Sequence, residues 1–242
     1  MGTDIHLQVQ GRRPDGTWEF VKRKPFPRYD EPGYDRDTDP TGRHYDLFAL
    51  LADVRNGSGF AGVYRHEPVD ALFADRGLPE EYADPAQAYD ENINEAFRKV
   101  FTGGDPWLGD HSFTWATLTE LLAVPWDTEF SSGGVVGPGG FKEWQETGRP
   151  SSWSGGISGG GIETHRDPEK YARMLDNGEI RYREGTEKGF YGGALDFCFV
   201  TWKWRPLEEN TFRTWIEGPV MASLAEEYGG TDNIRIIMGF DS

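Results

Sequence analysis

The stretch Thr3-Asp-Ile-His-Leu-Gln-Val-Gln10 alternates apolar and polar residues, and this alternation decides the fold prediction. Successive side chains of a strand point to opposite faces, so Ile5, Leu7 and Val9 form one apolar face. Pro14-Asp-Gly16 follows as a turn signal. A β-hairpin is therefore expected to open the chain.

The far end of the chain carries a matching signal. Asn233–Phe240 is typical of an apolar strand, and Leu195–Trp204 is an almost continuous run of apolar and aromatic residues. Helical patterns lie between the two ends, among them Asp46–Arg55 and the acidic segment 85–101. This order predicts an α+β fold: a mixed or antiparallel sheet that contains the N-terminal hairpin and the C-terminal strand, with helices packed on it.

The length of 242 residues suits one full core, so a single α+β domain over 1–242 is expected. Residues 131–161 interrupt the pattern, since eleven of them are glycine and six are serine. Such a stretch is typical of a lid, a binding loop or an insert, and we expect a long Gly-rich loop there. Trp153 within it is a candidate for stacking on a ligand ring; burial in the core is the alternative.

The charge excludes one class of partner. Twenty-five basic and 41 acidic residues give a net charge of −16, a field that repels the phosphates of duplex nucleic acid. Residues 67–95 hold nine acids against one base, Arg76, and form either a solvated surface or a surface for a basic partner. No apolar run suits a membrane helix or a signal peptide, and the one cysteine, Cys198, fits a reducing compartment. A cytoplasmic protein without a membrane partner is expected.

The first candidate site is Asp4-Ile-His6 on the opening strand. The strand period places both polar side chains on the face opposite Ile5, roughly 6–7 Å apart. Asp4 and His6 could share a divalent metal ion, or Asp4 could orient His6 as a general base. The alternative is a solvent-exposed strand face or a histidine hydrogen-bonded inside the sheet.

The second candidate site is Asp110-His-Ser112 with Thr114, which we expect just before a helix. Backbone N–H groups at a helix start bind anions, so Ser112 and Thr114 would contact a ligand. Asp110 and His111 would add a proton-transfer pair. Capping of the helix by these hydroxyl groups is the alternative.

Two weaker candidates complete the set. Glu163-Thr-His165 repeats the carboxylate–imidazole spacing, but a surface role is the favoured interpretation of this isolated pair. Arg55 follows the apolar helical stripe and is the best arginine for reversing the negative field at an anion site; an ion pair at the helix end is the alternative. The sequence contains no phosphate-binding P-loop, nucleophile elbow or His-Glu-x-x-His zinc motif.

Several short motifs resemble a family of uncharacterised bacteriophage proteins. The motifs are Met1-Gly-Thr-Asp-Ile-His6, Tyr45–Asn56, Arg76-Gly-Leu-Pro79, Asp110-His-Ser112 with Thr117–Leu121, and Phe240-Asp241. Members of that family typically open with Met-Gly-Cys-Asp-Ile-His, and Thr3 here replaces the cysteine. The resemblance covers residues 130–230 poorly. It implies a phage or prophage origin and a bacterial host cytoplasm, but no mechanism.

Three functions follow as hypotheses. The first is a phage accessory, non-virion protein, with a role in counter-defence, that binds or hydrolyses a small phosphate-bearing ligand such as a nucleotide or cyclic nucleotide signal. As an enzyme it would be a metal-dependent or His-based hydrolase, with His6, His111 and Asp110 as catalytic residues. The second is a non-catalytic acidic inhibitor that binds a basic host protein as a DNA mimic. The third is a virion-associated protein.

Overall fold

The structure of the chain is a computed structural model, which describes residues 2–29, 31–59, 63–82, 97, 100–184 and 193–241. The chain forms two compact units. Unit 1 comprises residues 1–54, 70–128 and 206–242, and unit 2 comprises residues 55–69 and 129–205. The expectation of one domain over 1–242 stays a prediction, because compactness alone does not tell whether the two units unfold together.

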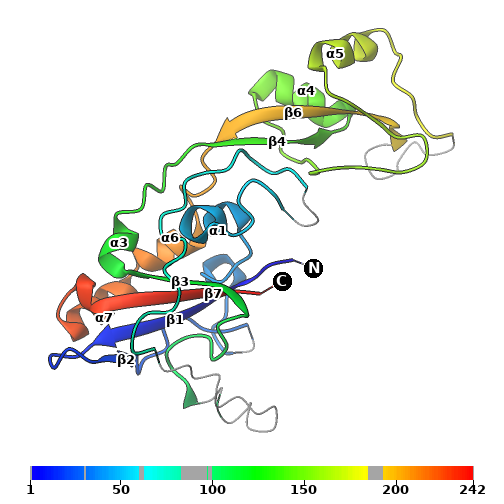
Figure 1. Ribbon diagram of the computed structural model, residues 1–242. Helices are drawn as coiled ribbons and strands as arrows, with labels where there is room; N and C mark the ends of the chain where they lie inside the picture. The colour runs from blue at the N-terminus through cyan, green and yellow to red at the C-terminus, as the bar shows by residue number, and fades with distance from the viewer. Residues whose placement is uncertain are drawn as a thin grey trace. The chain divides into compact units, whose positions relative to one another are not determined.

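Unit 1 is built on a four-stranded antiparallel sheet. Its described elements are β1 (Ile5–Arg12), β2 (Trp18–Phe20), η1 (Arg36–Thr38), α1 (Tyr45–Ala52), β3 (His111–Thr117), α3 (Leu118–Leu122), α6 (Thr211–Ile216), α7 (Pro219–Tyr228), η5 (Thr231–Asn233) and β7 (Ile234–Phe240). The strand order is β2-β1-β7-β3, with β1 and β7 side by side (Figure 1). The predicted α+β fold, with the N-terminal hairpin and the C-terminal strand in one antiparallel sheet, is confirmed.

Both faces of β1 are covered. Gln8 and Gln10 are as buried as the apolar residues between them. Gln8 Nε2 donates to the carbonyl of Asp105 at 2.9 Å, and Arg235 Nε donates to Gln10 Oε1 at 2.8 Å. These bonds make burial of the polar face tolerable, and they correct the expectation of a half-buried strand.

Helices cover the apolar face of this sheet. Ile5 lies opposite Phe240, whose ring packs against Phe48 of α1 with centroids 5.2 Å apart. Gly11, on the same face, leaves room for Tyr228 of α7, since an added Cβ would lie 2.3 Å from that ring. Because side chains alternate along a strand, His6 and the other polar residues of β1 point to the face away from α1 and α7.

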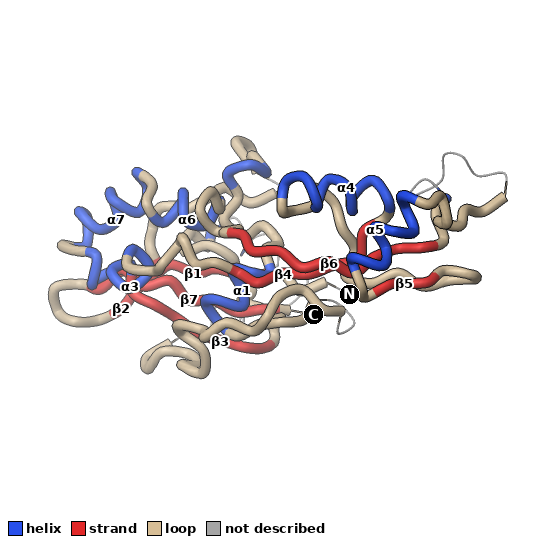
Figure 2. The backbone as a smooth tube through the Cα atoms, turned by 90° about the horizontal axis from the view of Figure 1, so that it is seen from above, coloured by secondary structure: helices blue, strands red, loops and turns tan. Residues whose placement is uncertain are grey.

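Unit 2 has a smaller mixed sheet. Its described elements are β4 (Phe130–Val136), α4 (Pro138–Thr147), β5 (Glu163–His165), α5 (Pro168–Asp176) and β6 (Asp196–Trp204). The strand order is β4-β6-β5, with β4 antiparallel and β5 parallel to β6. Figure 2 shows α4 and α5 alongside these strands. Residues 64–67 extend the sheet beyond β4, where Glu67 N–H donates to the Ser131 carbonyl at 2.8 Å.

The prediction of one long Gly-rich loop over 131–161 is wrong. Residues 131–136 belong to β4, and 138–147 form α4. An added Cβ at Gly133 would lie 2.8 Å from the rings of Phe199 and Tyr64, and one at Gly134 would lie 2.5 Å from Trp153. These glycines therefore allow aromatic rings to press on the strand, a packing role that composition alone does not distinguish from flexibility.

The two faces of β6 have different surroundings. Cys198, Val200 and Trp202 point toward the buried side chains of α4 and α5. Phe197 and Phe199 point the other way, beside Val135 of β4. Cys198 is free and buried, and burial raises the pKa of its thiol to about 12, so little reactive thiolate forms at neutral pH.

Capping residues and prolines mark the starts of three described helices. The Thr117–Glu120 capping box starts α3, Asp167 caps α5, and Pro219 opens α7. The predicted helix 85–101 lies almost wholly outside the described residues. Among the helices that are described, none has the length and apolar character needed to cross a membrane.

Candidate functional site

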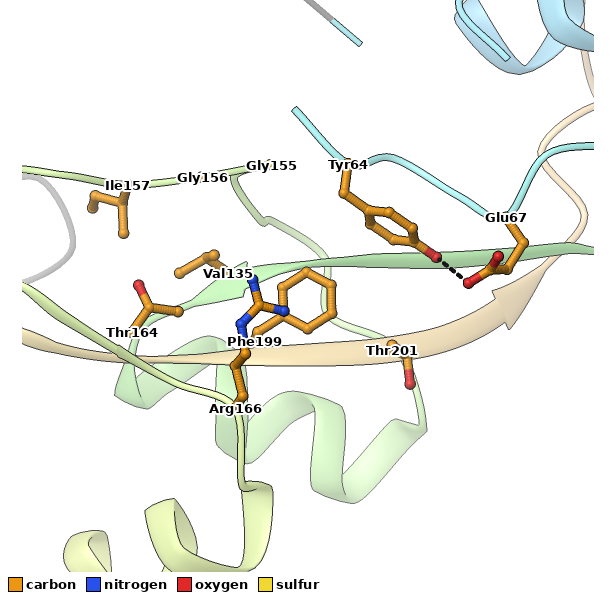
Figure 3. Close-up of a pocket in the computed structure, with 10 residues that line it drawn as sticks. All are labelled: Tyr64, Glu67, Val135, Gly155, Gly156, Ile157, Thr164, Arg166, Phe199 and Thr201. Carbon is orange, nitrogen blue, oxygen red and sulfur yellow. Dashed lines mark hydrogen bonds between the residues drawn. The ribbon is translucent and has the colours of Figure 1, made fainter. Parts of the chain in front are cut away.

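A pocket of about 630 Å³ lies on the face of the unit 2 sheet that α4 and α5 leave uncovered (Figure 3). This volume is in the range of small-molecule sites. The pocket is lined by Tyr64, Glu67, Val135, Gly155, Gly156, Ile157, Thr164, Arg166, Phe199 and Thr201. Because Val135, Phe199 and Thr201 alternate with core residues along β4 and β6, the strand period itself aims them into the pocket.

Arg166 supplies the positive charge of this pocket. Its guanidinium lies over the Phe199 ring, 5.1 Å from the centroid, as Figure 3 shows. The side chain is exposed, and among the described residues no carboxylate lies within ion-pair distance of it. A guanidinium held on an aromatic face keeps its hydrogen-bond donors available to an anion.

Tyr64 and Glu67 line the pocket beside Phe199. Tyr64 packs edge-on against Phe199 with centroids 5.7 Å apart, in the space left by Gly133. The Tyr64 hydroxyl donates to Glu67 Oε1 at 3.2 Å. Burial raises the pKa of Tyr64, and the Glu67 carboxylate adds to the effect, so the hydroxyl stays a donor.

One short segment of the Gly-rich stretch 131–161, Gly155–Ile157, lines the pocket. Ser154 pairs with Val135 by two backbone hydrogen bonds of 2.7 and 3.0 Å, and this pairing aligns Gly155–Ile157 along the rim. Trp153 lies on the other face, where its ring packs against Trp202 at 4.9 Å. The prediction that Trp153 binds the ligand in this loop is therefore not supported, because its ring belongs to the helix-covered core.

A second cluster lies on the opposite face of β5. His165 Nε2 is 3.1 Å from Asp196 Oδ1, and its Nδ1 is 3.8 Å from Glu163 Oε1. Ligand atoms of these three residues lie within 4.8 Å of one another, so the cluster could hold a metal ion. Arg181 Nη2 already lies 2.6 Å from Asp196 and 3.1 Å from Glu163, so a metal ion would have to displace this guanidinium.

The environment of Asp196 shows how strongly Arg181 is held. Burial alone would raise the pKa of this carboxyl, but hydrogen bonds from the side chain and backbone N–H of Arg181 and from His165 outweigh it and lower the pKa to about 2. Side chains alternate between the two faces of β5, so Glu163 and His165 point toward this cluster and Thr164 points toward the pocket. The cluster thereby fixes the strand that positions Thr164 and leads into Arg166.

The structure places His6 beside two carboxylates of unit 1. Residues 103–105 run along the outer edge of β1, and Asp105 N–H donates to the Leu7 carbonyl at 2.9 Å. Asp105 Oδ2 therefore lies 3.7 Å from His6 Nδ1, and Asp241 Oδ2 lies 3.5 Å from its Nε2. The imidazole thus separates two carboxylates.

Asp4 is occupied elsewhere. Its two oxygens accept hydrogen bonds from Arg43 Nε and Nη2 at 2.8 and 2.7 Å. A metal ion shared by Asp4 and His6 stays a prediction that this arrangement does not favour, because the guanidinium already neutralises the carboxylate.

The expected helix start at Asp110-His-Ser112 is wrong. His111 begins strand β3, and the next helix, α3, starts seven residues later at Leu118. Ser112 Oγ contacts His111 Nδ1 at 2.9 Å, and the buried Thr114 hydroxyl donates to the Phe73 carbonyl. Thr114 is therefore a structural residue rather than a ligand contact, and the helix-start argument for an anion at this motif does not hold.

The two histidines predicted as catalytic do not share a site. Both flank the end of β7, since His6 lies opposite Gly239 and His111 lies opposite Phe240. Neighbouring residues of β7 point to opposite faces, and the His111 ring stacks over Phe240. His111 and His6 therefore lie on opposite faces of the sheet. Arg55, also proposed for the ligand, does not line the unit 2 pocket.

Sequence reasoning missed most of the residues that line the pocket or surround the cluster. The Glu163/His165 pair was noted, but the surface role favoured for it is wrong for His165, which is buried against Asp196. Asp196 also carried a usable signal: a carboxylate inside an apolar strand needs a partner, and Arg181 is that partner. Arg166 carried none, because its role depends on Phe199, 33 positions away in the chain.

Comparisons of the chain with protein-family models, curated proteins and solved structures found no match. The resemblance to bacteriophage proteins therefore stays a prediction, and the functional argument rests on the geometry of the site.

Proposed function

We propose that this chain binds a small phosphate-bearing ligand that also carries a ring, such as a nucleotide or cyclic nucleotide signal, in the unit 2 pocket. The observation that carries the proposal is the Arg166 guanidinium, which lies over Phe199 without a carboxylate partner among the described residues. Arginine binds phosphate through paired, charge-assisted hydrogen bonds. Arg166 supplies the local positive charge that a ligand of this kind needs in a chain of net charge −16.

The other lining residues suit the rest of such a ligand. Tyr64 and Phe199 offer aromatic surface to a base, since base–aromatic stacking is worth about 1–3 kcal/mol. The hydroxyls of Thr164 and Thr201 suit phosphate or ribose oxygens, and Glu67 suits a sugar hydroxyl or an amino group. Gly155 and Gly156 at the rim expose backbone that a ligand can approach closely.

We propose binding rather than hydrolysis at this pocket, because neither His6 nor His111 lines it. In a phage accessory protein such binding would sequester a nucleotide signal of the host. That biological setting rests on the sequence resemblance, whereas the binding proposal rests on the pocket alone.

Isothermal titration of AMP, adenosine and inorganic phosphate into the purified protein tests the proposal. Arg166→Gln is expected to weaken AMP binding about tenfold and to leave adenosine binding within about twofold, since only the phosphate contact is lost. Arg149→Gln is the matched control, because Arg149 also lies over an aromatic ring of unit 2, that of Trp204, but outside the pocket. The proposal would be contradicted if both variants weakened AMP binding equally, or if the wild type did not bind AMP.

A divalent metal ion is a second candidate ligand of unit 2. The observation that favours it is the convergence of Glu163, His165 and Asp196. Because Arg181 holds both carboxylates, Arg181→Gln should bind Zn²⁺ more tightly than the wild type. Metal analysis after gel filtration in Zn²⁺ measures this, and an Arg181→Gln protein without zinc rules the site out.

The acidic inhibitor and the virion-associated protein remain alternative proposals. Half of the acidic stretch 67–95 lies outside the described residues, so its shape supports neither. Binding to a basic host protein would weaken steeply with added salt and survive Arg166→Gln, which separates it from nucleotide binding. Detection of the chain in purified particles would favour the virion role.

A further inference from the structure

A second cavity, of about 340 Å³, lies beside the start of β1 in unit 1, on the face that α1 and α7 leave uncovered. It is lined by Asp4, Ile5, His6, Phe26, Arg28, Tyr29, Asp39, Thr41, Asp105, Pro106 and Trp107. None of these residues belongs to unit 2, so the cavity is a separate site from the proposed nucleotide pocket.

The cationic side chains around this cavity are paired with carboxylates. Arg43 donates two hydrogen bonds to Asp4, and Arg28 Nη2 lies 2.8 Å from Glu31 Oε1. Lys24 shares the Glu31 carboxylate, so Arg28, Lys24 and Glu31 together carry one positive charge. Three further carboxylates at the cavity outweigh that charge.

The remaining titratable groups are mostly acids. Asp105 and Asp39 line the cavity, and Asp241 lies 3.5 Å behind the His6 ring. Asp39 accepts hydrogen bonds from Thr41 and from the Tyr34 hydroxyl, which leave its negative charge in place. The cavity therefore carries an excess of negative charge.

Aromatic rings form the rest of the wall. Trp107 packs against His6 with centroids 4.8 Å apart and is still 39% exposed, and Tyr29 is 71% exposed. Phe26 also lines the cavity. Exposed aromatic faces beside carboxylates attract organic cations, with Trp the most favourable ring.

We propose that this cavity binds a small organic cation, a primary or quaternary ammonium group, between the Trp107 and Tyr29 rings and the Asp105 and Asp39 carboxylates. The carboxylates attract the charge, and the rings replace part of its hydration shell. A neutral molecule of the same shape is not attracted by the carboxylates, and an anion is repelled by them.

The site is sensitive to protons. Burial raises the pKa of Asp105 to about 6, against the smaller lowering effects of His6, the Leu7 N–H and Arg28. A proton on Asp105 makes the cavity less negative, while the paired Arg28, Lys24, Glu31, Asp4 and Arg43 keep their charges. Cation binding is therefore expected to be tighter at pH 8 than at pH 5.

Ligand-observed NMR of the full chain tests the proposal with choline and its neutral isostere 3,3-dimethylbutan-1-ol, each of which gives one methyl signal. Choline is expected to bind about tenfold more tightly than the isostere at pH 8, and to weaken at pH 5. Trp107→Ala and Asp105→Asn should each weaken choline binding at pH 8. Tyr182→Ala, which removes an exposed ring of unit 2, should not.

Equal binding of the two ligands, unchanged choline binding by Trp107→Ala, or absence of choline binding by the wild type would each overturn the proposal. Arg166→Gln should leave choline binding unchanged, so failure here and failure of the nucleotide proposal are distinguishable.

Discussion

Replacing Asp196 by asparagine removes the charge at the centre of the unit 2 cluster and keeps the side-chain shape. The carboxylate is fully buried, and its folded pKa of about 2 lies below the usual value of 3.8. Lowering this pKa from 3.8 to about 2 corresponds to about 2.4 kcal/mol. Arg181 is half-exposed and its attraction is screened by water, so we expect Asp196→Asn to lower the free energy of unfolding by about 2 kcal/mol at pH 7.

The dependence on pH follows from the direction of the shift. The unfolded chain binds the Asp196 proton more tightly than the folded chain does, so the carboxylate stabilises the fold fully above about pH 4. This contribution is lost as the pH falls through about 2. The stability difference between wild type and Asp196→Asn should therefore shrink between about pH 4 and pH 2.

Urea unfolding followed by tryptophan fluorescence measures the loss, because Trp153 and Trp202 lie in the same core as the cluster. Glu163→Gln is the matched control: it removes a carboxylate, 57% exposed, that pairs with the same Arg181. We expect it to cost less than about 0.5 kcal/mol. Equal losses in the two variants, or a loss below about 0.5 kcal/mol for Asp196→Asn, would refute the reasoning.

Three further predictions concern single residues. Asp105 has a folded pKa of about 6, so its protonated form stabilises the fold below about pH 4, and this contribution is lost as the pH rises through 6. Asp105→Asn should therefore be more stable than the wild type at pH 8, by about 2 kcal/mol. Thermal or urea unfolding measures the gain, and the two proteins should be equally stable at pH 4. Gly133→Ala places a Cβ 2.8 Å from two pocket rings, so it should lower the free energy of unfolding by about 1–3 kcal/mol and weaken AMP binding. Gly139→Ala is the control: its added Cβ has no neighbour within 4 Å, so stability and AMP binding should both stay unchanged. Thr117→Ala removes the cap of α3 and should lower the melting temperature through a loss of about 1 kcal/mol; an unchanged melting temperature would show that the capping box contributes nothing.

The fold was predictable where one local pattern dominates. Alternation in β1 and the apolar run of β7 predict their pairing, because both strands need a partner and a covered face. The Gly-rich strand β4 was not predictable, since its glycines are explained only by rings from residues 64, 153 and 199. The glycine content of residues 131–136 does not tell a flexible loop from a strand packed against aromatic rings, because those rings come from distant parts of the chain.

The candidate site was less predictable than the fold. His6 was paired with the neighbouring Asp4 in the sequence prediction, whereas the carboxylates beside its ring are those of Asp105 and Asp241. The unit 2 pocket combines residues from five separate segments, and none of them is unusual in its own segment. Convergence of this kind is set by strand register, which the sequence of one strand does not reveal.

The most direct test of nucleotide binding in unit 2 is photolabelling with 8-azido-AMP followed by peptide mapping. The account predicts label on peptides that contain Tyr64 or Gly155–Ile157, with the label competed by unmodified AMP and reduced in Arg166→Gln at limiting probe concentration. Label confined to peptides of unit 1, or label on these peptides that AMP does not compete, would contradict it.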